Sequence, residues 1–65
     1  MKAVGRAIKV ARLAAGLTQD KLAEGADIAT RVLQKIEAGQ ITILVTTLIR
    51  IRRKIGCDYD DLLPK

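Results

Sequence analysis

Four polar side chains near the middle of the chain share one face of an expected helix. They are Thr30, Arg31, Gln34 and Lys35. The apolar residues around them recur at intervals of three and four, the period of a half-buried helix, and these are Ala29, Val32, Leu33 and Ile36. A hydroxyl, a guanidinium, a carboxamide and an ammonium group on one short helix can hydrogen-bond to base edges and phosphates. The pattern therefore indicates a surface that binds nucleic acid.

The net charge of the chain also favours an anionic partner. Twelve Lys and Arg residues against seven Asp and Glu give a formal net charge of +5 in 65 residues. This balance favours nucleic acid first and an anionic membrane surface second. The uncharged run that includes residues 41–49 is shorter than the roughly 20 residues that span a bilayer. A basic helix over residues 45–55 lying on a membrane is the weaker alternative, because the core needs its apolar stripe.

The composition argues against an enzyme, a metal site and a bound cofactor. The chain has no His, Ser, Asn, Phe or Trp, and its one cysteine, Cys57, has no histidine to activate it. A single cysteine forms no internal disulfide, which fits a reducing compartment. Lys2, Arg6 and Lys9 interrupt the N-terminal apolar stretch, so we expect no signal peptide and a cytoplasmic, nucleoid-associated protein.

Glycines divide the chain into four segments with helical features and a short tail. Each segment is followed by a glycine where a helix C-cap favours a left-handed residue, and these are Gly16, Gly25, Gly39 and Gly56. The first segment carries an apolar stripe at Val4, Ile8, Ala11 and Ala15. The second spans about residues 18–25, where Thr18 can cap the N-terminus. A last helical turn is expected at Leu62 and Leu63.

The fourth segment gives two conflicting signals. Residues 41–47 are rich in β-branched side chains, which favour a strand by local propensity. Helical spacing nevertheless continues through Leu44, Leu48, Ile51 and Ile55, so we expect a helix from about Val45. The sequence thus predicts one all-α domain over residues 1–65, a compact bundle of five short helices. The tight connection between the second and third helices predicts a helix-turn-helix.

Three blocks of the sequence resemble a known family of DNA-binding proteins. They are residues 16–24 (GLTQDKLAE), 33–39 (LQKIEAG) and 55–63 (IGCDYDDLL). With matching spacing they resemble the phage repressor and Cro-type helix-turn-helix regulators, the Xre family. The resemblance implies a lambda-repressor-like fold that binds double-stranded DNA as a homodimer on a palindromic operator. It also implies that a helix over about residues 29–38 enters the major groove.

The resemblance implies DNA-surface roles for eight residues: Thr18, Gln19, Ala29, Thr30, Arg31, Gln34, Lys35 and Gln40. Gln19 matches a residue that contacts a phosphate and steadies the third helix. Arg31 suits guanine, Gln34 suits adenine or a phosphate, and the Thr30 methyl suits thymine. Lys35 either reads guanine or neutralises a phosphate, and the backbone at Gln40 is expected to meet the DNA strand.

Other positions of the family pattern concern structure. Arg12 and Glu37 match an ion pair between the first and third helices. Asp27 stands where the family commonly has glycine in the turn, and Ala29 where a serine or threonine often caps the third helix. Arg52 occupies a site that is usually small and apolar, within a basic run that we expect to be solvated.

Some apolar residues exceed what a small core can hold. We expect Ile41, Ile43 and Leu44, with Tyr59, to form a dimer interface, and Val10 and Leu13 also lie off the main stripe. The sequence thus predicts a sequence-specific transcriptional regulator without enzymatic activity, cofactor or small-molecule ligand. Cro-like repressors, controllers of restriction–modification genes and antitoxins all stay open. The alternative is a protein-interaction module, or an antitoxin-type partner-binding protein, that keeps the fold.

Overall fold

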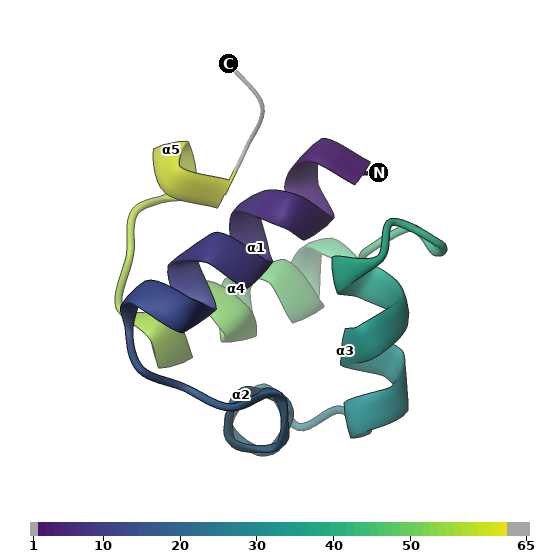
Figure 1. Cartoon of the computed structure of the whole chain (residues 1–65), viewed down its shortest axis with the longest axis horizontal. Helices are drawn as coiled ribbons and strands as arrows, with labels where there is room; N and C mark the ends of the chain where they lie inside the picture. Colours follow the sequence, from purple (N-terminus) through teal and green to yellow (C-terminus); the bar gives the residue numbers. More distant parts are fainter. Residues whose placement is uncertain (1, 63–65) are drawn as a thin grey trace.

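The computed structural model describes residues 2–62 and contains five helices joined by short connections (Figure 1). They are α1 (Lys2–Ala14), α2 (Gln19–Gly25), α3 (Thr30–Glu37), α4 (Val45–Ile55) and α5 (Tyr59–Leu62). The described part of the chain has no strand, so the predicted all-α bundle of five short helices is confirmed. Leu63, expected in the last turn, lies outside the described residues.

All five helices share one core. α1 runs through the middle of the molecule and contacts α3, α4 and α5, while α2 packs against α3 and α4 (Figure 1). Each helix contributes one fully buried large side chain, and these are Ile8, Leu22, Leu33, Ile51 and Leu62. Burial of such a side chain is worth about 1.5–3 kcal/mol. Because isolated helices shorter than about 12–15 residues are marginal in water, this shared core is what keeps the short helices folded.

The buried faces of α1 and α3 are narrower than predicted. Val4 and Ile8 are buried, but Ala15 is exposed just past the end of α1, and Arg12 is buried instead. On α3 only Leu33 and Ile36 are buried, while Val32 is 37% exposed and Ala29 precedes the helix as its exposed N-cap. Some residues of the predicted apolar faces are exposed near the helix ends, because no neighbouring helix covers them there.

The turn between α2 and α3 corrects the prediction for Gly25. Gly25 is the last residue of α2 and not a left-handed cap, whereas Asp27 takes the left-handed conformation with φ 57°. Asp tolerates this region because its short polar side chain can hydrogen-bond locally. The other three cap glycines, Gly16, Gly39 and Gly56, have the predicted positive φ angles.

The segment before α4 is extended and joins the core. Leu44 is the N-cap of α4 with φ −74° and ψ 147°, so the helix begins at Val45 as expected. Ile43 is only 9% exposed and belongs to the core cluster. The prediction that Ile43 forms a dimer interface is therefore wrong, because the fold of a single chain already covers it. Leu44, by contrast, is 69% exposed.

Arg52 is not simply a solvated member of a basic run. Its guanidinium lies 4.5 Å from the centre of the Tyr59 ring, a cation–π contact. Its Nη1 donates to the carbonyl oxygen of Cys57 at 3.5 Å. The long side chain therefore connects the end of α4 to α5, at a position where the family usually has a small apolar residue.

Gly5 allows α1 to approach the C-terminal end of α3. A Cβ at this position would collide with the carbonyl oxygen of Ile36 and lie 2.9 Å from that of Glu37. We expect Gly5→Ala to lower the free energy of unfolding by about 1–3 kcal/mol, because backbone atoms cannot move aside. Urea unfolding followed by circular dichroism measures this change.

Gly25→Ala is the matched control for this substitution. The three atoms nearest to a Cβ at Gly25 would all belong to the side chain of Lys54, which is flexible and can swing away. We expect near-neutral stability there, since alanine is the better helix former. Equal effects of the two substitutions would contradict the account of the α1–α3 contact.

Candidate nucleic-acid interface

A two-point ion pair attaches α3 to α1. Arg12 Nε donates to Glu37 Oε2 at 2.8 Å, and Arg12 Nη2 donates to Glu37 Oε1 at 3.2 Å. The two side chains are only 8% and 4% exposed. This is the pair expected from the sequence, and its fork-shaped geometry constrains both distance and angle between the helices.

The same ion pair reaches the start of α2. Gln19 Nε2 donates to Glu37 Oε1 at 3.1 Å, and Arg12 Nη1 donates to the carbonyl oxygen of Leu17 at 2.9 Å. Gln19 therefore steadies α3 through Glu37, using one of the two N–H donors of its amide. The neighbouring Thr18 is the N-cap of α2, where its hydroxyl oxygen accepts a hydrogen bond from the backbone N–H of Lys21 at 3.1 Å.

The outer face of α3 carries a hollow of about 520 Å³ lined by hydrogen-bonding side chains. Its lining consists of Arg31, Gln34, Lys35, Ala38 and Gln40. Two cationic and two carboxamide side chains with no carboxylate among them suit an anionic, hydrogen-bonding ligand. Arg31, Gln34 and Lys35 are all exposed, so the fold leaves this surface uncovered.

Thr30 has a partner that sequence reasoning missed. Its hydroxyl donates to Asp20 Oδ1 at 2.8 Å, a contact between the first turns of α3 and α2. In the sequence Asp20 is only an acidic residue near a helix N-terminus, where a negative charge is favourable. Spacing along the chain gives no signal for its pairing with Thr30. Ala29, the N-cap of α3, makes no side-chain capping bond, as its residue type predicts.

The predicted dimer residues do not form one surface. Ile41 and Leu44, which precede α4, are 37% and 69% exposed. Tyr59 is 40% exposed on α5, which lies on the opposite side of the molecule from the segment before α4 (Figure 1). Among the predicted interface residues, then, Ile41 and Leu44 are the exposed apolar residues of the segment before α4.

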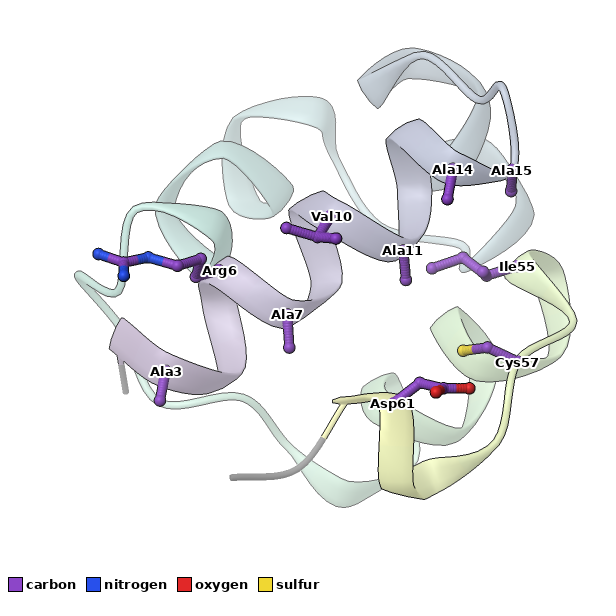
Figure 2. A pocket seen from close by; sticks show the side chains of 10 residues that line it. All are labelled: Ala3, Arg6, Ala7, Val10, Ala11, Ala14, Ala15, Ile55, Cys57 and Asp61. Carbon is purple, nitrogen blue, oxygen red and sulfur yellow. The ribbon is translucent and has the colours of Figure 1, made fainter. Parts of the chain in front are cut away.

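A second hollow, of about 750 Å³, lies between α1 and the C-terminal part of the described chain (Figure 2). In Figure 2 Val10 and alanines of α1 face it from one side, and Cys57 and Asp61 from the other. Burial, with the nearby negative charge of Asp61, raises the pKa of the Cys57 thiol above its ordinary value. This hollow is mainly apolar, so the surface with converging hydrogen-bond donors is the one on α3.

Residues 2–62 contain neither a metal site of clustered side chains nor a membrane-spanning helix. In that range no group of three or more His, Cys, Asp or Glu side chains is arranged to hold a metal ion. None of the helices described there is long and apolar enough to cross a membrane.

Comparisons with known proteins agree with this geometry. A family model described as helix-turn-helix matches residues 8–62. The uncharacterized HTH-type transcriptional regulator y4mF of Sinorhizobium fredii is 30% identical over 61 residues, which cover 94% of this chain and 80% of that protein. The crystal structure of the restriction-modification controller protein C.AhdI from Aeromonas hydrophila matches with a TM-score of 0.90 and 19% identity, over 95% of this chain and 94% of the other.

Proposed function

Because this chain belongs to the Cro-type helix-turn-helix family of DNA-binding transcriptional regulators, we propose that it reads a specific operator by placing α3 in the major groove. The observation that carries this proposal is the hollow lined by Arg31, Gln34, Lys35 and Gln40, on a helix held in place by buried polar contacts. A reading surface on a rigid element loses little entropy when it binds.

Each side chain of this surface has a chemical role in the proposal. The planar fork of Arg31 pairs with O6 and N7 of guanine, and the amide of Gln34 pairs with N6 and N7 of adenine. Lys35 and the backbone around Gln40 contact phosphates at the edge of the groove. Gln19 braces Glu37 beneath α3, and the N-terminus of α2 faces the adjacent phosphate.

The size of the chain supports a dimer in this role. The longest dimension of the Cα trace is 27 Å, which is less than the roughly 34 Å between half-sites one helical turn apart. Two copies related by a two-fold axis can read both halves of a palindrome. We place the exposed Ile41 and Leu44 in the contact between them.

The remaining parts of the proposal concern the class of regulator. The chain acts at the nucleoid without enzymatic activity or cofactor, either as a repressor or as a restriction-modification controller like the structurally similar C.AhdI. Its regulation then depends on its own concentration, through dimer formation.

Binding to a library of palindromic duplexes tests the proposed function. We expect enrichment of one sequence, and affinity for it that falls about 10³-fold or more between 50 and 200 mM salt, as for a protein with six or more phosphate contacts. Affinity for unrelated duplexes should be weaker by about 10³-fold at the same salt concentration. If no sequence is enriched from the library, the proposed function is wrong.

Sedimentation equilibrium tests the dimer. We expect the wild-type chain to be dimeric at tens of micromolar and Leu44→Lys to be monomeric, because a charge on the contact must be desolvated. Leu13→Lys is the matched control, since Leu13 is 58% exposed near the C-terminal end of α1. That end of α1 lies on the opposite side of the molecule from the segment before α4 (Figure 1). A wild-type monomer, with or without operator, would contradict the dimer.

A further inference from the structure

We propose that Asp20 sets the base preference of Thr30, and is therefore a specificity-determining residue that never needs to touch a base itself. This inference rests on the proposed function, because it assumes that the start of α3 faces the edges of base pairs. It concerns the direction of one hydrogen bond, from the Thr30 hydroxyl to the Asp20 carboxylate.

The direction of that bond follows from chemistry. A threonine hydroxyl has one proton to donate and two lone pairs that accept, whereas a carboxylate only accepts. At an Oγ1–Oδ1 distance of 2.8 Å the proton of Thr30 must therefore point to Asp20. Hydrogen bonds to ionised acceptors are short and about twice as strong as neutral ones, so this proton is not free for DNA.

Because the Thr30 hydroxyl already donates its proton to Asp20, it can only accept a hydrogen bond from a base. In the major groove the donors are the amino groups of adenine and cytosine, whereas the keto oxygens of guanine and thymine and the N7 atoms of both purines only accept. Thr30 is half-exposed in the first turn of α3, beside the exposed Arg31. Asp20 thus makes Thr30 favour adenine or cytosine on the strand it faces, and disfavour guanine or thymine.

Asp20 has a second effect, which must be separated from the first. Its carboxylate is exposed and lies beside the surface that approaches DNA, so it repels phosphates whatever the base sequence. Loss of the charge strengthens binding to all duplexes alike. Loss of the hydrogen-bond acceptor changes only the base preference at the position that faces Thr30.

Two substitutions at Asp20 separate these effects. Asp20→Asn removes the charge but keeps a carbonyl oxygen that can accept from Thr30, while Asp20→Ala removes both. Glu24→Gln controls for charge alone, since Glu24 is exposed on the same helix. Thr30→Val removes the hydroxyl with little change of shape. Circular dichroism verifies that each variant is folded.

The measurement is enrichment of bases from a palindromic duplex library by each variant. We expect the wild-type chain and Asp20→Asn to favour adenine or cytosine over guanine or thymine at one position by about fivefold, the effect of a single hydrogen bond. In Asp20→Ala the preference at that position should fall below about twofold. Asp20→Asn and Asp20→Ala should both bind random duplexes more tightly than wild type.

A double-mutant comparison tests whether Asp20 affects base preference through the Thr30 hydroxyl. Asp20→Ala should change no base preference in the Thr30→Val background, because the hydroxyl through which it acts is missing. If Asp20→Ala keeps the wild-type preference at every position, or changes it equally with and without the hydroxyl, the inference is wrong while the proposed function stands. If the wild-type chain enriches no sequence, the proposed function itself fails and the inference fails with it.

Discussion

Glu37→Gln is expected to lower the free energy of unfolding by about 3–5 kcal/mol, the cost of leaving a buried charge without its partner. Arg12 is buried, and Glu37 accepts hydrogen bonds from both Arg12 and Gln19. A chain of this length has only about 3–10 kcal/mol of stability in total. The variant should therefore lose a large share of its stability, as measured by circular dichroism and urea titration.

Two comparisons distinguish loss of the ion pair from a general effect of charge. Glu24→Gln removes an exposed carboxylate on α2, and we expect a change of less than about 0.5 kcal/mol. The double variant Arg12→Met with Glu37→Gln should be more stable than Glu37→Gln alone, because no buried charge is left unpaired. Equal stability of Glu37→Gln and Glu24→Gln would show that the pair contributes nothing to the fold.

Arg31→Ala is expected to have the largest effect on the choice of DNA sequence. Arg31 is exposed and lines the hollow on α3, where a bidentate contact to guanine is worth about 1–3 kcal/mol of discrimination. The variant should lose about 10- to 100-fold of its preference for guanine at one position of each half-site. Competition between the selected operator and its single-base variants measures this loss.

Arg53→Ala is the control, because it removes the same charge from an exposed position on α4. We expect it to leave base preferences unchanged and to alter only the salt dependence, if anything. A loss of affinity in Arg31→Ala that is equal on every sequence would mean that Arg31 binds a phosphate. The selectivity between bases would then have to come from Gln34 and Lys35.

The helices and the chemistry of the exposed face are specified by local sequence. Periodicity and cap residues are local properties, so the start of α4 at Val45 and the left-handed Gly39 could be predicted before any contact between helices was known. The exposed face of α3 followed from the same period. The Arg12–Glu37 pair, 25 residues apart, was available only through resemblance to a family.

Contacts between helices determine which side chains meet and which stay exposed. Periodicity cannot tell that Ile43 enters the core, that Arg52 reaches Tyr59, or that Asp20 holds the Thr30 hydroxyl. Each of these depends on how two segments approach in space, and packing between helices is set by the whole core at once. Local sequence thus specifies what each helix offers, and only the assembled bundle specifies what each side chain contacts.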